Sequence, residues 1–361
     1  MTGKQQNRIV SRIKHGQRLS FDDGLALYEC PDLNRLATLA TCVRRRHNGN
    51  AVYYNRNFHI EPTNVCVNDC VFCSYRRRAG EDGSWALSLD DVRELCRRYV
   101  GAPVTEVHIV GGVHPGRDIY FYAALLDVVR QTLPQVAIKA FTAVEIDYMA
   151  KHAGMSYEKA LRLLQENGLA AMPGGGAEIF DETVRRQICP RKTDAQTWLY
   201  IHETAHDLGI RTNATMLFGH IETPAHRIDH LIRLRELQDT TGGFDAFIPL
   251  KYKASNNALG AVVGEISTSD VLRTIAVCRM MLDNIAHIKA YWPMLGKDVM
   301  QLALLFGADD IYGTIDDSTR IYSMAGADEH PSLCVPELEN IITDAGFVPT
   351  ERDTFYNTVT K

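Results

Sequence analysis

Three cysteines lie close enough in the sequence to bind one metal centre. They are Cys66, Cys70 and Cys73, spaced C-x3-C-x2-C within the segment HIEPTNVCVNDCVFCSYRRR. The other six of the nine cysteines stand singly in apolar or helical stretches, where a free cysteine behaves as a small hydrophobic residue. The odd total of nine cysteines and the absence of a secretory signal predict no disulfide framework. The triplet is therefore the part of the sequence that predicts chemistry.

Three thiolates at this spacing suit an iron–sulfur cluster better than a zinc ion, which is the alternative. Structural zinc usually takes four Cys or His ligands, and no second cysteine pair or H-x3–5-H motif lies near the triplet. A [4Fe–4S] cluster normally takes four thiolates, so three leave one iron open to an outside ligand. S-adenosylmethionine (SAM) has an amino-carboxylate group that can chelate that iron, and SAM with an Fe–S centre supports radical chemistry. The spacing, with Phe72 before the last cysteine, resembles the motif of the radical SAM enzymes.

The elements around the triplet alternate between short apolar segments and longer periodic ones. Helices between the apolar segments are predicted to begin after Ser88, Ser156, Thr223-Pro224 and Ser269. This alternation predicts an α/β fold with a parallel sheet, and eight units in about 260 residues match a (β/α)8 TIM-type barrel of the radical SAM kind. An open doubly wound sheet is the alternative. The predicted strands are 58–63, 106–110, 137–141, 169–172, 212–218, 246–250, 288–292 and 309–312.

The domain organisation is predicted to be one barrel with two additions. Residues 1–55 form a helical N-terminal lead-in with Ser20 as an N-cap, residues 56–320 the barrel, and residues 321–361 a C-terminal extension packed on it. The net charge is 39 − 44 = −5 with no basic block, which argues against nucleic-acid and membrane partners. No apolar run approaches the ~20 residues of a membrane span, so a cytoplasmic protein is expected.

Beyond the cysteines, the chain resembles the aminofutalosine synthases of the futalosine route to menaquinone. Sister enzymes that cyclise dehypoxanthine futalosine or build deazaflavins share the cysteine loop but differ where this chain has TAVEI and GHIET. Such a cyclase is one alternative, and a non-catalytic Fe–S or zinc-binding scaffold is the other. One departure is Ser74-Tyr75, where the family more often has Ala-Phe. The segments that show the resemblance lie within residues 53–353: NRNFHIEPTNVCVNDCVFC, EVHIVGGVHP, IKAFTAVEI, MPGGGAEIF, RRQICPRK, TNATMLFGHIETP, LRELQDTTGGFDAFIPL, IKAYWPMLG, FGADDIYGT and ERDT.

The resemblance implies a reaction that consumes SAM as a co-substrate. A [4Fe–4S] cluster cleaves SAM to methionine and a 5′-deoxyadenosyl radical. The radical adds to the enol-ether double bond of the small-molecule substrate, 3-[(1-carboxyvinyl)oxy]benzoate. Migration of the aryl group and loss of the carboxylate as CO₂ or bicarbonate then give 6-amino-6-deoxyfutalosine. An electron donor such as flavodoxin is also implied.

Five residues at the ends of predicted strands are candidates for binding SAM. Gly111 and Gly112 follow the second strand, where glycine lets a ligand approach the backbone; an ordinary turn is the alternative. Thr142 and Glu145 close the third strand, and Glu178 follows the glycine run of the fourth. A carboxylate at the barrel rim suits a ribose or an ammonium group, although Glu145 could equally be a helix N-terminal acid.

Three residues of the fifth unit are candidates for catalysis. Asn213 belongs to the strand and shares one face with Thr215 and Leu217 by alternation. His220, just past the strand, could hold a carboxylate or move a proton. Glu222 is the third candidate, and the alternative for it is a simple helix cap.

The substrate has two carboxylates, so its site should contain cations. Lys251 and Lys253 follow the sixth strand. Lys289 lies inside the apolar seventh strand and needs a partner there, which could be a buried Asp309 or Asp310. The run Arg76, Arg77, Arg78 is either a solvated face or a docking patch for the electron donor.

Overall fold

The computed structural model describes residues 3–315, 321–326 and 332–359. The strands are β1 Ala51–Asn55, β2 Asn57–Ile60, β3 Glu106–Ile109, β4 Ala137–Ala140, β5 Leu169–Met172, β6 Arg211–Phe218, β7 Phe244–Lys251, β8 His287–Ile288, β9 Asp310–Gly313 and β10 Val348–Glu351. The helices are α1 Gly3–Lys14, α2 Phe21–Tyr28, α3 Leu33–Asn48, α4 Leu89–Arg97, α5 Ile119–Thr132, α6 Ala143–His152, α7 Tyr157–Glu166, α8 Glu182–Ile188, α9 Ala195–Asp207, α10 Pro224–Thr241, α11 Thr268–Met281, α12 Trp292–Leu295, α13 Lys297–Leu305, α14 Ile321–Met324 and α15 Val335–Asp344.

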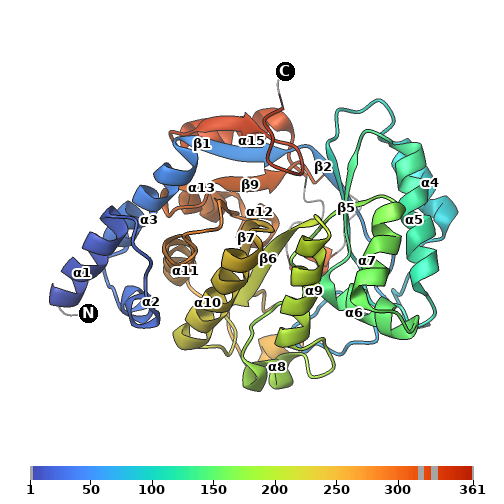
Figure 1. The fold of residues 1–361 in the computed structure, drawn as a ribbon, viewed down its shortest axis with the longest axis horizontal. Coiled ribbons are helices and arrows are strands. Elements are labelled where there is room, and N and C mark those ends of the chain that lie inside the picture. Colours follow the sequence, from blue (N-terminus) through green and yellow to red (C-terminus); the bar gives the residue numbers. More distant parts are fainter. Residues whose placement is uncertain (1–2, 316–320, 327–331, 360–361) are drawn as a thin grey trace.

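The main sheet contains strands β2 to β8, paired in sequence order and all parallel. The next strand, β9, is bridged to the end of β8 through Lys289 and Asp310 and also pairs with β1, which runs almost directly into β2. The sheet therefore curls into a barrel, with helices on its outer face (Figure 1). This order has no reversal, which the doubly wound alternative requires, so the predicted fold class is confirmed.

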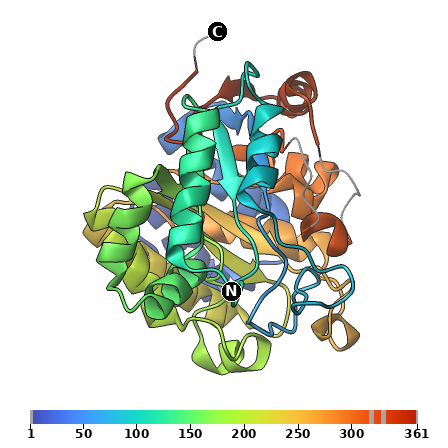
Figure 2. The ribbon, with the colours of Figure 1, turned by 90° about the vertical axis from the view of Figure 1, so that its right-hand side faces the viewer.

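A smaller sheet, in the order β10-β1-β9, adjoins the main sheet where β9 meets the end of β8. Strand β1 pairs in parallel with β10, from Ala51 opposite Val348 to Tyr54 opposite Glu351. Figures 1 and 2 show this sheet and helix α8 at opposite ends of the molecule. The lead-in 1–55 is thus not helical throughout, because it ends in a strand that the chain's last strand completes. The two boundaries between the three predicted segments, after residues 55 and 320, stay predictions, and residues 316–320 before the second lie outside the described residues.

Most of the predicted helix starts are found where the sequence places them. Ser88, Ser156 and Thr223 each accept a hydrogen bond from a backbone N–H of the helix that follows. The exception is α11, which is capped by Ser267 and not by Ser269. The segment Ser-Thr-Ser offers more than one hydroxyl for a cap, and the choice depends on where the helix docks.

Alternation along the strands separates the apolar core from the barrel interior. In β3, Val107 and Ile109 are fully buried among the core residues, whereas His108 lines the interior cavity. Strand β6 is buried from its second residue to its last. Because successive side chains point to opposite faces, the outer set packs the helices and the inner set is free to meet a ligand.

Candidate active site

A cavity of about 330 Å³ lies inside the barrel and extends to the loops after the strands. Cys66, Cys70 and Cys73 all line it, and they are the only cysteines among its described lining residues. All three are free thiols and partly exposed. The structure therefore brings the predicted ligand triplet to the place where a barrel enzyme has its active site.

The loop that holds the cysteines, residues 61–88, is fastened at its base. Thr63 and Ala86 form an antiparallel bridge, and the Thr63 hydroxyl donates to the carbonyl oxygen of Trp85 at 2.7 Å. The Asn64 side chain accepts from Trp85 N at 2.8 Å and donates to Gly83 O at 2.9 Å. These bonds fix the loop's base independently of any bound group.

The departure from the family pattern at Ser74-Tyr75 is accommodated by the backbone. The Ser74 hydroxyl donates to Ser255 O at 2.8 Å, and the Tyr75 hydroxyl donates to Thr63 O at 3.1 Å. Neither polar group is left unsatisfied, so the two hydroxyls tie the outer part of the loop to its surroundings.

Gly111 and Gly112 are required by close backbone contact. A Cβ atom at Gly112 would lie 2.4 Å from Val65 O, and one at Gly111 would lie 2.8 Å from Thr63 O. Gly112 N donates to Thr63 O at 2.7 Å. Both glycines also line the cavity. They therefore seat the cysteine loop against the end of β3, at the wall of the cavity.

Burial shifts the pKa of two of the three thiols. Burial raises the pKa of Cys66, and that of Cys70 to about 12, while Lys192 and, at Cys66, the backbone N–H groups of Val113 and Asn68 oppose the increase. In the described part of the chain no three His, Cys, Asp or Glu side chains converge to hold a single ion. Ligands of a cubane bind different irons and need no common point. This geometry favours the cluster over the zinc alternative.

Thr142 and Glu145 form a capping box at the start of α6. The carboxylate accepts from Thr142 N at 2.7 Å and from its hydroxyl at 2.8 Å, and its other oxygen accepts from Gly111 N at 3.3 Å. Burial raises the pKa of Glu145 to about 7. Both residues line the cavity, so the helix-cap alternative is present together with the predicted rim position.

Glu178 also lines the cavity and forms a buried ion pair with Lys192. Its backbone has φ 47°, the left-handed region that non-glycine residues rarely adopt. Glu178 and neighbouring thiols raise the pKa of Lys192, whose Nζ lies 5.5 Å from the centre of the Phe72 ring. Sequence reasoning missed Lys192, although it belongs to the segment RRQICPRK, because one lysine in an arginine-rich segment gives no sign of burial.

The predicted alternation in the fifth unit is confirmed, because Asn213, Thr215 and Leu217 all line the cavity. The Thr215 hydroxyl donates to Gly174 O at 2.5 Å. A Cβ at Gly174 would lie 2.5 Å from Asn213 O, so the glycine run lies directly against β6. Asn213 therefore faces the site from a rigid strand.

His220 and Glu222 are not among the residues that line the cavity. Glu222 accepts from Gly219 N at 2.7 Å, from His220 N at 2.9 Å and from Arg227 Nε at 2.7 Å. The His220 ring lies 3.1 Å from this carboxylate and from Leu217 O, and burial lowers its pKa. The pair closes the loop after β6, and its predicted catalytic role stays a prediction.

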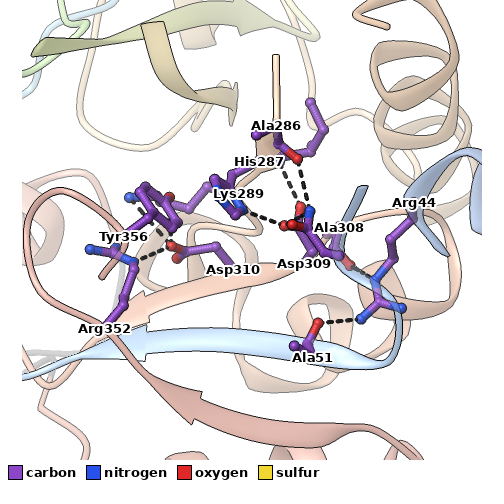
Figure 3. Close-up of polar contacts among 12 residues, drawn as sticks. Arg44, Ala51, Ala286, His287, Lys289, Ala308, Asp309, Asp310, Arg352 and Tyr356 are labelled. Carbon is purple, nitrogen blue, oxygen red and sulfur yellow. Dashed lines mark hydrogen bonds and ion pairs between the residues drawn. The ribbon is translucent and has the colours of Figure 1, made fainter. Parts of the chain in front are cut away.

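Lys289 has the buried partner that its position predicts, and it is Asp310 at 3.8 Å. Arg352 and Tyr356, from the chain's last segment, both donate to Asp310 at 2.7 Å (Figure 3). Lys289 does not line the cavity. Lys251 is also turned away, paired with Glu265 at 2.6 Å, whereas Lys253 and Arg76 line the cavity.

Sequence comparisons agree with this geometry. Residues 60–234 match the model of the radical SAM superfamily, and residues 241–361 match the CofH/MqnC C-terminal region. The chain is 45% identical to an aminodeoxyfutalosine synthase of Thermus thermophilus, over 97% of this chain and 95% of that protein. It is 40% identical to one of Streptomyces coelicolor, over 97% and 93%.

The chain belongs to the aminodeoxyfutalosine synthase family of radical SAM enzymes. It is therefore an enzyme that uses a [4Fe–4S] cluster and SAM and acts on a small molecule. It is also 38% identical to a cyclic dehypoxanthine futalosine synthase of Streptomyces coelicolor, over 96% of this chain and 87% of that protein.

Solved structures confirm the fold of this family member. Methylornithine synthase superposes with a TM-score of 0.76 at 20% identity, covering 94% of this chain and 97% of that chain. The FeFe-hydrogenase maturase of Carboxydothermus hydrogenoformans gives 0.74 at 18% identity, covering 98% and 81%. No helix within the described ranges is long and apolar enough to cross a membrane.

Proposed function

We propose that the enzyme converts 3-[(1-carboxyvinyl)oxy]benzoate, SAM and water into 6-amino-6-deoxyfutalosine, methionine and bicarbonate. The observation that supports this most directly is the 45% and 40% identity to two aminodeoxyfutalosine synthases over nearly the full length of each chain. The cavity supports it too, because it combines three cysteines with an apolar interior large enough for an aryl ring.

Cys66, Cys70 and Cys73 would hold the cluster, which supplies the electron that cleaves SAM to a 5′-deoxyadenosyl radical. The backbone at Gly111 and Gly112 would receive the methionine part of SAM. The three remaining predicted SAM-binding groups, Thr142, Glu145 and Glu178, stand beside these glycines and the cysteines around the same cavity. They would orient the ribose and the amino group by hydrogen bonds.

Asn213 would contact the substrate directly, because it faces the cavity from β6. His220 and Glu222 would act as positioning residues. Their contacts hold Gly219 and thus the loop that follows β6. In this assignment the protein's task is to fix the reacting double bond beside the adenosyl group and to exclude water from the radical.

The electron donor would dock beside Cys66. A groove there is lined by Arg76, Arg78 and Arg191 together with Asp69, and Arg191 reaches Asp69 at 3.3 Å. Such a basic rim fits an acidic protein such as flavodoxin. The rate of cluster reduction by flavodoxin should then fall as the salt concentration rises.

The decisive experiment is an anaerobic incubation of the reconstituted enzyme with dithionite, the enolpyruvyl benzoate and SAM labelled in its adenosyl group, followed by mass spectrometry. The expected product is 6-amino-6-deoxyfutalosine that contains the label. Release of labelled 5′-deoxyadenosine with no labelled adduct would refute the proposal and favour a cyclase-type reaction. Unchanged SAM would also refute it.

A further inference from the structure

The inner end of the cavity is lined by polar side chains from three strands. His108 in β3 and Lys139 in β4 are direct register partners, and Tyr312 comes from β9. We call these three residues the cavity floor. The Tyr312 hydroxyl lies 2.6 Å from His108 Nδ1 and 2.8 Å from His59 Nε2. Tyr312 is therefore hydrogen-bonded to His108, and the sheet register places Lys139 beside His108.

The floor retains unused hydrogen-bonding capacity. Lys139 donates to Glu106 at 2.7 Å, which accounts for one of the three N–H bonds of an ammonium group. His108 Nε2 is buried and has no hydrogen-bond partner among the described residues. A tyrosine hydroxyl has one proton, and if Tyr312 donates it to His108 Nδ1, then His108 Nε2 carries the ring proton and is a donor. The floor can therefore offer N–H groups to an oxygen ligand.

The charges around the floor are unequal. Glu106 interacts electrostatically with Lys139, Arg352 and Lys289, and Asp310 pairs with Arg352 and Lys289. With Lys289 protonated, three buried cations face two buried carboxylates. A buried charge without a counter-charge is costly, and Lys289 Nζ has no hydrogen-bond partner in the described chain. One further anion would balance the group.

We infer that the cavity floor binds the ring carboxylate of the aromatic substrate, with Lys139 as the cationic anchor. The chemical identity of this anion rests on the proposed function. In the proposed function the amino-carboxylate of SAM binds at the cysteine loop, so the anion that reaches the floor belongs to the second substrate. Ile248, Leu250 and Tyr291 line the cavity as well and provide apolar surface for an aryl ring. The reacting double bond would then face the cysteines.

The test compares two ligands on the same holoenzyme. They are 3-[(1-carboxyvinyl)oxy]benzoate and the analogue whose ring carboxylate is a carboxamide. Wild-type enzyme should favour the carboxylate about 10- to 100-fold in kcat/KM, the range of a charge-assisted hydrogen bond. In Lys139→Met this preference should fall to near one, mainly through KM. Calorimetric titration of the SAM-free holoenzyme with each ligand, which cannot react there, should give the same ratio as Kd values.

Lys297→Met is the matched control, because Lys297 pairs with Glu337 at 3.9 Å on the outer surface and should leave the preference unchanged. If removing the partner of Glu106 prevents folding, the double variant Glu106→Gln/Lys139→Met removes both charges and should give the same loss of preference. An unchanged preference in a folded Lys139 variant that still forms the adenosylated product would overturn the floor assignment alone. If wild type forms no adenosylated product, the proposed function itself is wrong.

Discussion

The two ends of the cavity are built differently. The cysteine end depends on loops, namely the segment 61–88 and the glycine run Gly174–Gly176, and on glycines that allow backbone contacts too close for a Cβ. The cavity floor depends on strands, and the sheet register alone sets His108 beside Lys139. A loop site can adapt to a bulky cluster, whereas a strand site fixes the distance between groups. The difference suggests that the cysteine end serves the shared radical chemistry and the floor serves substrate choice.

The largest effect should follow from removing a cluster ligand. Cys70→Ser should abolish cluster loading and all SAM cleavage, because two thiolates cannot replace the three that the cavity presents. Iron and sulfide analysis of anaerobically purified protein, with the absorbance change on adding dithionite, measures loading. Cys334→Ser is the matched control, since this exposed cysteine precedes α15. Full SAM cleavage by Cys70→Ser would end the radical assignment.

The next effect should come from Lys192, the buried cation at the cysteine end. Lys192→Met leaves Glu178 as a buried carboxylate without its partner and should lower the free energy of unfolding by about 3–5 kcal/mol. Denaturant unfolding measures this loss. Lys297→Met is the control, because Lys297 and its partner Glu337 are both about half exposed; it should stay within about 0.5 kcal/mol. Equal losses in the two variants would contradict a buried pair.

The sequence predicted the cysteine end better than the floor, for a physical reason. The cysteine triplet and the glycine pair are short motifs whose chemistry is readable from local spacing. The floor joins residues from β3, β4 and β9, so only the register of the sheet brings them together. Lys139 stood inside an apolar predicted strand just as Lys289 did, and its burial with Glu106 could have been anticipated by the same argument.

The fold shows the same division between local and distant information. Caps such as Thr223 depend on neighbouring residues and were predicted; in the structure α10 begins after Thr223 and ends at Gly242, which is in the left-handed conformation. Strand β1 was missed because AVYYN is short, and its partners β9 and β10 lie more than 250 residues away. The predicted strand 288–292 is shortened to β8, since Trp292 and Pro293 begin a helix instead.

A smaller effect should follow from disturbing the close backbone packing at Gly112, which seats the cysteine loop. Gly112→Ala places a methyl group 2.4 Å from Val65 O and should destabilise the protein by about 1–3 kcal/mol through overpacking. Thermal unfolding and SAM binding by equilibrium dialysis should both reveal the displaced loop. Gly264→Ala is the control, because nothing lies within 4 Å of its added Cβ. If Gly112→Ala is as stable as wild type and binds SAM normally, the cysteine loop can move to accommodate the methyl group without loss of stability.

The smallest effect concerns Lys289, the buried cation near the cavity floor whose Nζ has no hydrogen-bond partner among the described residues. Burial lowers the pKa of Lys289 from its usual 10.5 to about 7, so above pH 7 the unfolded chain holds a proton that the folded protein has released. The free energy of unfolding therefore rises with pH because of Lys289, by about 1 kcal/mol between about pH 7 and pH 8. Denaturant unfolding at both pH values should show this increase in wild type and not in Lys289→Met, in which Asp310 keeps Arg352 and Tyr356. If the free energy of unfolding of the two proteins changes with pH in the same way, the Lys289 ammonium group already has a sufficient counter-charge in the folded protein. A wild-type slope that disappears when the enolpyruvyl benzoate is bound would instead mean that the ligand's carboxylate keeps Lys289 protonated, as a floor that lacks one anion requires.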